Sequence, residues 1–558
     1  MVILEEGNNL NSVYDTKEKV HARALEAVGK TLGEIDAKGT KNVKNKSYPG
    51  NVIEQVWFNH PADNNAEPDF PKAGVELKVT PLDKQTKHVK KKKVTKLIAG
   101  ERLVLNIINY QNEYGKTFEQ SSFWYKNKLI ELIQYYRRDV SHKKKISSGE
   151  IIEDKTQFQV LYANLLSMTE LKDFGLSKNT VIEIPEKDLE IIKQDWLKIS
   201  EYINSNKAEQ LSEGLTNYLG ACTKSATSDV FTKQKHTNVS AKPRAYSFKA
   251  KFINKLINNH IIGHDHTEAI NSIVKDVSEL EKKTLEEIIL SRFTPFYGMK
   301  QSELIHSLNI KVDKSSQKNI NNMIIRGILK LPTTTEEVTS EEIEKAEIRL
   351  KTVTLRRGQP KEHFKFMGIP SFIELVKESW EESKVYDFLD SQKFLLLVFN
   401  DFNIKKNGSN SYETNPEKII FIGAKFWNMP ISDIDGPVRR VWKTEIDKLK
   451  NGVELTFTKN ENNKIRINNN FIKPSLKEIL HLRPDAEVAQ YRPQYDKIIL
   501  DKGIAKSKSM NNSRKLPHPA KWINRPESEK DNYTDDYMTK QAWWLSKEYI
   551  YEQIKDLL

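Results

Sequence analysis

Apolar residues recur every three or four positions in several segments, and this spacing predicts helices. The first segment covers residues 17–28, and Gly29 ends it. Residues 188–203 show the same spacing. Residues 265–290 also show it, within a highly charged stretch that contains no glycine or proline. We expect the last of these to be a long helix that connects two domains.

Other segments have the spacing of strands. Residues 75–79 alternate apolar and charged side chains, so Glu76 and Lys78 should lie on one face of a strand. Residues 128–136 form a mostly apolar run rich in isoleucine and leucine, which predicts a second strand.

Two short helices are predicted between the first helix and the first strand. Thr31 and Glu34 have the spacing of a capping box, which marks a helix start. Residues 52–58 predict a buried helix in which Glu54 is the one acidic residue. A carboxylate in such apolar surroundings is unusual, so Glu54 is a candidate for a functional role.

Several segments of the first half resemble segments of the second half, and they occur in the same order. This order predicts two copies of one fold. The matched segments are 29–35 with 298–304, 72–78 with 345–351, 128–133 with 393–398, and 245–253 with 542–550.

The length of the chain agrees with two domains. A single hydrophobic core rarely serves more than about 300 residues, and this chain has 558, of which 38% are hydrophobic. We therefore expect globular domains over residues 1–263 and 291–558, joined by a connecting helix over 264–290.

The chain carries no signal for a membrane or for secretion. No apolar run approaches the roughly 18 residues that span a bilayer, and the N-terminus lacks the features of a signal peptide. Cys222 is the single cysteine, so no internal disulfide can form. We expect a cytoplasmic protein in which Cys222 is a small packing residue.

The net charge favours a polyanionic partner. There are 89 Lys and Arg against 76 Asp and Glu, a surplus of 13, and the isoelectric point is about 9.2. Basic residues cluster at 87–96, 137–145 and 506–515. For any one cluster a solvated loop is a better explanation than phosphate binding, whereas the overall surplus and its clustering favour a polyanionic partner.

The strongest chemical pattern is Asp69 followed by Glu76 and Lys78. Two carboxylates can hold Mg²⁺, and a lysine on the same strand face can orient a water molecule beside a phosphate. The pattern suits metal-assisted hydrolysis of a phosphodiester, with Glu54 as a further acidic group. By itself it also fits a surface strand that carries an ion pair.

In this context the sequence resembles the MutH/Sau family of GATC-specific endonucleases. The resemblance rests on KTLGEI at 30–35, GNVIE at 50–54, DF at 69–70 and GVELK at 74–78. It implies a mixed α/β (α+β) fold with two related restriction-endonuclease-like domains, each with a central mixed sheet flanked by helices. It also implies Mg²⁺ as the cofactor, held by Asp69 and Glu76.

The resemblance implies further site residues. Lys128 would be an additional catalytic lysine, with Lys126 as the alternative. Lys224, Arg244 and Tyr246 lie in segments similar to those with which the family reads DNA. The other interpretations are a phosphate contact for Lys224 and a core aromatic for Tyr246.

The second copy lacks the catalytic pattern. Arg349 falls where Glu76 stands in the first copy, Ile325 falls at the position of Glu54, and Glu342 falls near that of Asp69. A guanidinium in place of a metal ligand predicts a chemically silent domain that binds DNA without cutting it.

We therefore expect a type II restriction endonuclease that cuts double-stranded DNA 5′ of the guanine in GATC. By the resemblance, the second domain would bind another GATC site and promote cleavage, and chains would associate on DNA. The alternatives are a strand-nicking mismatch-repair endonuclease that needs a partner protein, and a non-catalytic GATC-binding regulator.

Overall fold

The structure is a computed structural model. It describes residues 13–61, 66–89, 92–137, 143–145, 151–171, 180–224, 230–261, 272–312, 319–331, 340–406, 411–459, 465–493 and 512–558. These residues form two compact units. Unit 1 holds the described residues within 1–224, 230–289 and 336–348, and unit 2 holds those within 290–335 and 349–558. Within the described residues, no helix is long and apolar enough to cross a membrane.

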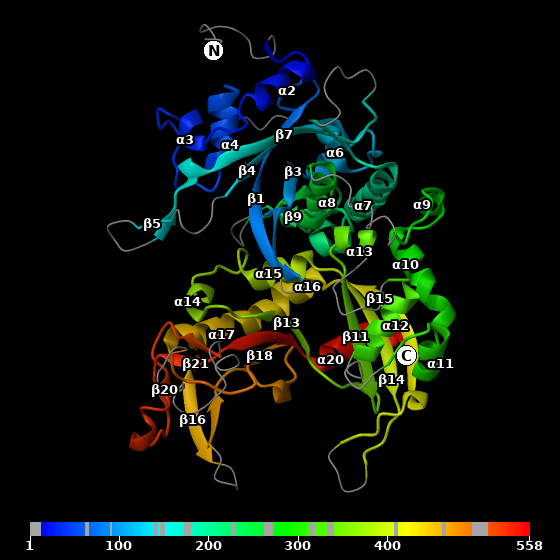
Figure 1. The fold of residues 1–558 in the computed structure, drawn as a ribbon, viewed down its shortest axis with the longest axis vertical. Coiled ribbons are helices and arrows are strands. Elements are labelled where there is room, and N and C mark those ends of the chain that lie inside the picture. Colours follow the sequence, from blue (N-terminus) through cyan, green and yellow to red (C-terminus); the bar gives the residue numbers. More distant parts are fainter. Residues whose placement is uncertain are drawn as a thin grey trace. The chain divides into compact units, whose positions relative to one another are not determined.

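Unit 1 is built on a mixed sheet with the strand order β2-β1-β4-β7-β8. The central strand β4 is buried along almost its whole length, which explains its continuous apolar run. Figure 1 shows β1, β4 and β7 in unit 1. The strands are β1 (Glu76–Val89), β2 (Lys92–Ala99), β4 (Leu129–Tyr136), β7 (Gln159–Ser167) and β8 (Val181–Glu183).

A second sheet of unit 1 has the order β3-β10-β9, and helices complete the unit. These strands are β3 (Leu103–Ile107), β9 (Leu219–Thr223) and β10 (Arg244–Phe248). The main helices are α2 (Lys17–Leu25), α3 (Leu32–Ile35), α4 (Tyr48–Asn51), the π-helix η1 (Val52–Trp57), α6 (Ser122–Asn127), α7 (Glu186–Asn204) and α8 (Ala250–Ile261).

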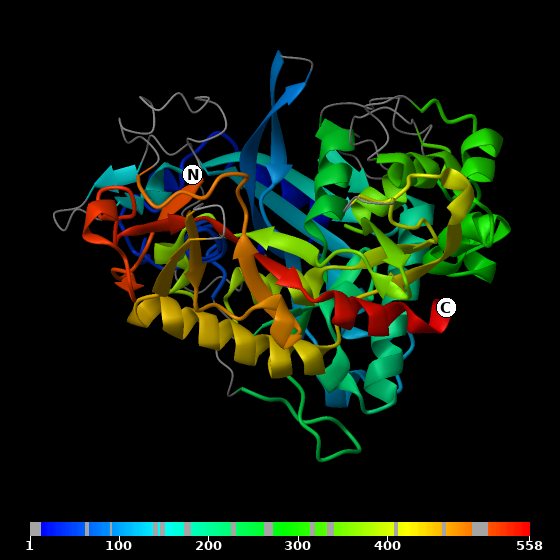
Figure 2. The same ribbon diagram turned by 90° about the horizontal axis from the view of Figure 1, so that it is seen from below.

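Most of the elements predicted for unit 1 are confirmed. Helices cover the ranges expected near 17–28, 52–58 and 188–203, and strands cover those near 75–79 and 128–136. Both hydrogen bonds of the capping box at the start of α3 are present. Strand β1 is much longer than predicted, because beyond Leu82 it leaves β4 and continues only with β2. Figure 2 shows this two-stranded extension.

The single connecting helix predicted over 265–290 is wrong. Residues 272–276 are not helical, and two separate helices follow, α9 (Ser278–Lys282) and α10 (Leu285–Phe293). The part of the prediction at 265–271 lies outside the described residues.

A local cap explains the break between α9 and α10. The backbone N–H of Thr284 donates to the Glu287 carboxylate at 2.8 Å, and the Thr284 hydroxyl accepts from the Glu287 backbone N–H at 3.2 Å. This capping box begins a new helix where apolar spacing alone predicts a continuous one.

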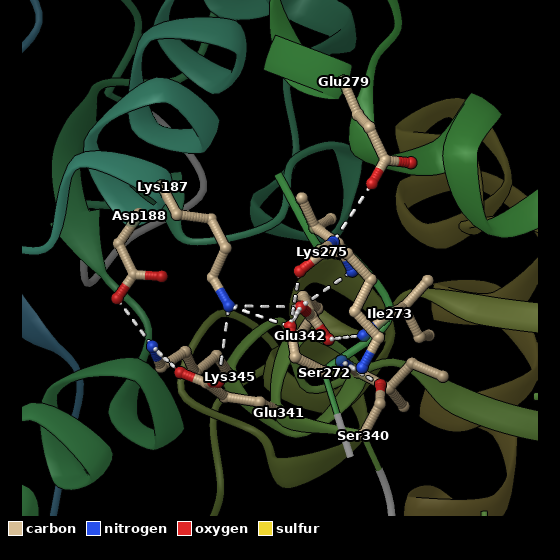
Figure 3. Close-up of polar contacts among 12 residues, drawn as sticks. Lys187, Asp188, Ser272, Ile273, Lys275, Glu279, Ser340, Glu341, Glu342 and Lys345 are labelled. Atoms are coloured by element: carbon tan, nitrogen blue, oxygen red, sulfur yellow. Dashed lines mark hydrogen bonds and ion pairs between the residues drawn. The ribbon is translucent and has the colours of Figure 1, made fainter. Parts of the chain in front are cut away.

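Helix α13 (Glu341–Lys345) also differs from the predicted division, because it belongs to unit 1. Figure 3 shows how its carboxylates are held. Glu342 is fully buried and accepts from the backbone N–H groups of Ile273 at 2.9 Å and Val274 at 3.2 Å. The Ser272 hydroxyl donates to the same carboxylate at 2.5 Å, and Lys187 Nζ lies 3.3 Å from it.

Lys345 makes the second buried anchor of α13. Its Nζ lies 2.6 Å from the Asp188 carboxylate and 2.5 Å from that of Glu341. Burial disfavours the charged lysine, but the two carboxylates outweigh it and raise the pKa of Lys345. A buried charge is retained only with such partners, which explains why this segment stays with unit 1.

Unit 2 has a sheet with the order β12-β11-β14-β15 and two three-stranded sheets, β13-β22-β18 and β17-β16-β20. Its strands include β11 (Arg349–Arg356), β12 (Gln359–Pro360), β13 (Phe364–Gly368), β14 (Phe394–Asp401), β15 (Ile419–Trp427), β16 (Glu454–Lys459), β17 (Ile465–Asn469), β18 (Leu480–Pro484), β20 (Lys521–Trp522) and β22 (Gln541–Leu545). Its main helices are α11 (Gln301–Ser307), α12 (Ile320–Ile328), α15 (Lys384–Ser391), α17 (Arg439–Asn451) and α20 (Lys547–Ile554).

The main sheets of the two units share one register. Strands β1 and β4 are parallel, and so are β11 and β14. Glu76 pairs with Ile130, and the pairing of β4 with β7 shifts directly after the fourth residue beyond Ile130. Arg349 pairs with Phe394, and the pairing of β14 with β15 shifts directly after the fourth residue beyond Phe394. Arg349 therefore occupies the register position of Glu76.

A glycine contact repeats at the same place in both units. The Gly29 N–H donates to the Val160 carbonyl at 2.9 Å, and the Gly298 N–H donates to the Phe421 carbonyl at 2.8 Å. Val160 and Phe421 are the first residues paired beyond the register shift. By this register, residues 393–398 correspond to 129–134, whereas the sequence comparison paired them with 128–133. Apolar runs carry no marker of register, whereas a bulge does.

Candidate active site

A tight turn before β1 brings Asp69 and Glu76 together. Phe70 and Val75 form an antiparallel bridge with N···O distances of 2.9 and 3.2 Å. Asp69 precedes this bridge and Glu76 follows it. As a result, the backbone N–H of Asp69 donates to Glu76 Oε2 at 3.3 Å.

The Asp69 carboxylate is held by the backbone of the same strand. Its Oδ2 accepts from the Leu77 N–H at 2.8 Å, and the Asp69 side chain remains half-buried. The two carboxylates therefore flank one short piece of backbone, as the sequence pattern predicts.

Glu76 is the electrostatic centre of the site. Its side chain is only 1% exposed, Lys78 Nζ lies 2.5 Å from Oε1, and Lys126 Nζ lies 3.7 Å from Oε2. Burial raises the pKa of Glu76, and the charge of Asp69 acts in the same direction, while Lys78 and Lys126 oppose it. A nearby cation stabilises the ionised form of such a carboxylate.

The structure favours Lys126 over Lys128 as the additional lysine. Lys126 lies in the last turn of α6 and reaches Glu76 with a side chain that is 14% exposed. Lys128 caps the same helix, and its side chain is exposed. The sequence placed both in one segment, but only the helix geometry decides which one turns toward β1.

Glu54 lies in the π-helix η1 and has a histidine partner. His60 Nδ1 lies 3.7 Å from Glu54 Oε1, and the His60 ring packs against Phe70 with a centroid distance of 5.8 Å. His60 thus links the helix of Glu54 to the turn beside Asp69. No spacing in the sequence indicated His60, and the catalytic role of Glu54 stays a prediction.

The opposite face of the sheet carries a buried pair that the sequence did not reveal. His21 Nδ1 lies 2.9 Å from the Glu131 carboxylate, and both side chains are fully buried. Burial raises the pKa of Glu131, and the hydrogen bond to His21 opposes the shift. Glu131 pairs with Leu77 between the two β1 site positions, so the pair ties α2 to the strand next to the site.

The predicted DNA-reading residues separate into two groups. Lys224 is exposed and directly follows β9, and the adjoining residues 225–229 lie outside the described part of the chain. Arg244 and Tyr246 are each 1% exposed. Neither side chain is accessible at the surface of this structure, and contact of these two residues with DNA stays a prediction.

The burial of both has a clear cause. All five residues of β10, the central strand of its sheet, are buried, so both faces of the sheet are covered along this strand. Arg244 Nη1 donates to the Ala221 carbonyl at 2.7 Å, and the Tyr246 ring lies 5.4 Å from that of Phe123. Tyr246 is a core aromatic. Cys222, on the neighbouring strand, is buried as predicted.

The donor set at Asp69 and Glu76 fits Mg²⁺. Both residues offer hard oxygen ligands, and Mg²⁺ is commonly held by one or two carboxylates together with water and phosphate oxygens. Among the described residues, no group of three or more His, Cys, Asp or Glu side chains converges as a complete metal cage.

Comparison with known proteins agrees with this class of site. The family model described as "DNA mismatch repair enzyme MutH" matches residues 58–160, which include Asp69, Glu76, Lys78 and Lys126. The fold over these residues is thus that of a MutH-like restriction-endonuclease domain.

The full-length comparison is more specific. The chain is 36% identical over 553 residues to the type II restriction enzyme Sau3AI of Staphylococcus aureus, covering 98% of this chain and 99% of that protein. This chain belongs to the family of that restriction enzyme, and this membership indicates a nuclease.

Two mismatch repair proteins match a smaller part of the chain. MutH of Shigella flexneri is 24% identical over 261 residues, which cover 45% of this chain and 96% of that protein. MutH of Shewanella woodyi is 26% identical over 251 residues, which cover 43% of this chain and 91% of that protein. A nearly complete MutH thus corresponds to less than half of this chain.

Proposed function

We propose that this protein is a Mg²⁺-dependent type II endonuclease that cuts double-stranded DNA 5′ of the guanine in GATC. The observation that carries the proposal is the buried Glu76 carboxylate beside Asp69, with two lysine ammonium groups within 3.7 Å. The match to a restriction enzyme over almost the whole chain supports the same conclusion.

Asp69 and Glu76 would hold Mg²⁺. When bound, this ion neutralises charge on the scissile phosphate and makes water a better nucleophile. Lys78, held 2.5 Å from Glu76, would orient the attacking water and offset the developing charge. Lys126, on the neighbouring helix, would help to offset the charge that develops at the phosphate. Glu54 with His60 would order water at the edge of the site.

Lys224 is our candidate for contact with DNA in unit 1. It is exposed at the end of β9, and lysine can donate to the major-groove edge of guanine or to a phosphate. A change of sequence preference in a Lys224→Ala variant would favour base reading. A uniform loss of affinity would favour phosphate contact.

Unit 2 would be a duplicated and inactive domain that binds DNA as an effector site. The shared register and the repeated glycine contact support a common origin. Arg349 occupies the position of Glu76, so the second strand cannot offer the same metal ligand. Binding of a GATC site to unit 2 would promote cleavage by unit 1.

Cleavage of both strands requires more than one catalytic event. GATC is palindromic, so its two strands present equivalent cutting positions. Among the positions compared, only unit 1 carries the carboxylate pair. We propose that chains pair on DNA, as palindromic recognition favours twofold assemblies.

The test uses the purified full-length chain, Mg²⁺ and two matched duplexes that differ only in having GATC or GTAC. Mapping of the product ends should show 5′ phosphates directly before the guanine on both strands of the GATC duplex. The GTAC duplex and a reaction with EDTA should remain intact. An intact GATC duplex under all Mg²⁺ conditions would refute the proposal.

The MutH family match favours one second candidate, a nicking endonuclease that requires a partner protein. That function predicts a cut in one strand only, and little product from the purified chain. The same end mapping separates the two functions, because double-strand breaks appear only for the restriction enzyme.

A further inference from the structure

The connection between β9 and β10 in unit 1 carries positive charge without negative charge. Residues 230–249 contain four lysines, one arginine and one histidine, and they contain no Asp or Glu. We call residues 230–241 the β9–β10 loop. Its two lysines, Lys233 and Lys235, are both exposed. The loop therefore presents a positive surface that suits a polyanion.

Hydrogen bonds hold the β9–β10 loop near its ends and in its middle. Thr232 and Ala241 form an antiparallel bridge with N···O distances of 2.7 and 2.9 Å. Between them, Gln234 is only 4% exposed, and its amide oxygen accepts from a backbone N–H at 2.8 Å. Its amide nitrogen donates to the Glu209 carboxylate and to the Val239 carbonyl, each at 2.9 Å. A loop fixed in this way loses little conformational entropy when it binds a partner.

Two exposed side chains of the loop meet at one aromatic ring. Tyr114 follows the short helix α5 (Tyr110–Glu113), and its ring centre lies 4.8 Å from that of His236 and 5.1 Å from Lys235 Nζ. The ring stabilises the ammonium group. Within the described part of the chain, neither Lys233 nor Lys235 forms an ion pair with a carboxylate. Both ammonium groups can therefore bind an anion from solution.

The loop packs against the segment that leads to the active site. Residues 114–121 connect Tyr114 to α6, and Lys126 of α6 lies 3.7 Å from Glu76. Directly after the loop, the Lys242 carbonyl accepts from the Tyr110 hydroxyl at 2.6 Å. A duplex bound at Glu76 would extend beyond the site on both sides, so the loop is a candidate for contact with it.

The loop also exposes apolar side chains beside its lysines. Val230 is 49% exposed, Phe231 is 56% exposed and Val239 is 52% exposed. Proteins that hold DNA combine cations at the phosphates with apolar side chains in the minor groove. An apolar surface for a protein partner would not need the surrounding positive charge, so the composition of the loop favours DNA.

We propose that the β9–β10 loop binds the duplex beside the cleavage site, with Lys233 and Lys235 at backbone phosphates and Phe231 in the minor groove. The proposal rests on the proposed function as an endonuclease and adds a contact surface to it. Phosphates carry no sequence information, so this contact holds any duplex. Lys224 remains the candidate for reading the sequence.

Site-directed cross-linking tests the contact in the full-length protein. Cys222 is the single cysteine and is buried, so a cysteine introduced at the surface can be labelled selectively. A Phe231→Cys variant is labelled with a photo-activatable maleimide, mixed with the GATC duplex in EDTA and irradiated. The matched control is Leu197→Cys, because Leu197 is an apolar residue of α7 that is 58% exposed.

The yield of cross-linked DNA should be at least about fivefold higher for Phe231→Cys than for Leu197→Cys, because a groove contact brings the label against the DNA. Equal yields would overturn the proposal. Cross-linking of Phe231→Cys to a second protein chain in place of DNA would also overturn it, because the loop would then be a protein interface.

Binding in EDTA gives an independent measure. The double variant K233Q/K235Q should raise the dissociation constant about tenfold or more, and should lower the salt slope of binding by about 1 to 2. The factor should be the same for the GATC and the GTAC duplex. A loss confined to the GATC duplex would contradict phosphate contact.

The control K193Q/K198Q removes the same charge from α7, where the two lysine side chains are 38% and 46% exposed. It should change affinity less than about threefold. Both double variants should unfold at the wild-type temperature, since all four lysines lie at the surface. Equal effects of the two double variants on affinity would contradict a specific role of the loop.

Cleavage with Mg²⁺ by the wild-type protein is measured in parallel, so that two failures can be told apart. Cleavage at GATC together with equal cross-linking yields would overturn the loop contact alone. Absence of both cleavage and DNA binding by the wild-type protein would overturn the proposed function together with it.

Discussion

The first residues of β1 and of β11 occupy the same register but have opposite charge. Glu76 is buried between two lysines, whereas Arg349 is exposed beside an aromatic ring. The backbone pairing around them is the same in kind, down to the position at which the pairing of β4 with β7, and of β14 with β15, shifts its register. The sheet therefore fixes where a side chain stands, and the residue type alone decides whether a carboxylate or a cation is presented there.

The acidic residues that precede these two strands differ as well. Asp69 remains half-buried in a turn, where one oxygen contacts the strand backbone. Glu342 is fully buried, and both of its oxygens accept hydrogen bonds from Ser272, Ile273 and Val274. A carboxylate that already has such partners serves the stability of unit 1 and is not available to a metal.

The largest effect is expected from removal of the unit 1 carboxylate or lysine. Glu76→Ala and Lys78→Ala should each lower the rate of DNA cleavage about 10³-fold or more, because each removes charge needed at the phosphate. Single-turnover cleavage with Mg²⁺ measures the rate, and a binding assay should show only a small change. Lys198→Ala, at an exposed position of α7, is the control and should cut normally.

The role of Glu342 is tested by stability. Glu342→Ala should lower the free energy of unfolding by about 3–5 kcal/mol, because it leaves the buried N–H groups of Ile273 and Val274 without their acceptor and removes one of the two carboxylates beside Lys187. Urea denaturation measures the loss. Glu344→Ala on the same helix removes a partly exposed pair with Lys255 and should cost no more than about 1 kcal/mol. Equal losses in the two variants would show that Glu342 is not a buried anchor.

The two neighbouring lysines of unit 1 can be separated by the same cleavage assay. Lys126→Ala should slow cleavage roughly 10- to 100-fold, since its ammonium lies 3.7 Å from Glu76. Lys128→Ala should have a smaller effect, because that side chain is exposed at the end of the helix. A larger loss with Lys128→Ala would restore the assignment made from the sequence.

The smallest expected effect is a change of stability with pH. The pKa of Glu76 is raised, so its ionised form costs folding free energy in the metal-free protein. This cost is absent at low pH, where both folded and unfolded states are protonated, and it is fully present once the pH exceeds the raised pKa. Glu76→Gln should therefore raise the Tm of the metal-free protein near neutral pH, and this gain should vanish near about pH 4.

Mg²⁺ provides the control for that experiment. It should raise the Tm of the wild-type protein, because a ligand that binds only the folded state stabilises it. The Glu76→Gln variant should gain much less from Mg²⁺. A variant that is less stable than the wild type at neutral pH would contradict the sign of the shift.

Much of the site could be predicted from the sequence because it is local. Asp69, Glu76 and Lys78 lie within ten residues, and a turn followed by an alternating strand is enough to bring them together. The buried strand at 129–136 was also predictable, since a continuous apolar run has few other placements. The same local reasoning failed for residues 265–290, where a capping box interrupts the apolar spacing.

Other features depend on contacts between distant segments. Arg244 and Tyr246 looked suited to DNA contact, but the order of strands places them in the centre of a packed sheet. Folding alone brings His60 and His21 near Asp69 and Glu76. The position of Lys126 on its helix places its ammonium near Glu76, whereas Lys128 is exposed.

The sequence by itself determined that the first strand carries a carboxylate and a lysine on one face and that the second strand lacks the carboxylate, because residue type and short-range spacing set both. The tertiary structure decided which lysine joins the site, which basic and aromatic residues are buried, and to which unit α13 belongs. Those outcomes depend on burial and on partners far along the chain, and a buried charge keeps its place only where the fold supplies the opposite charge.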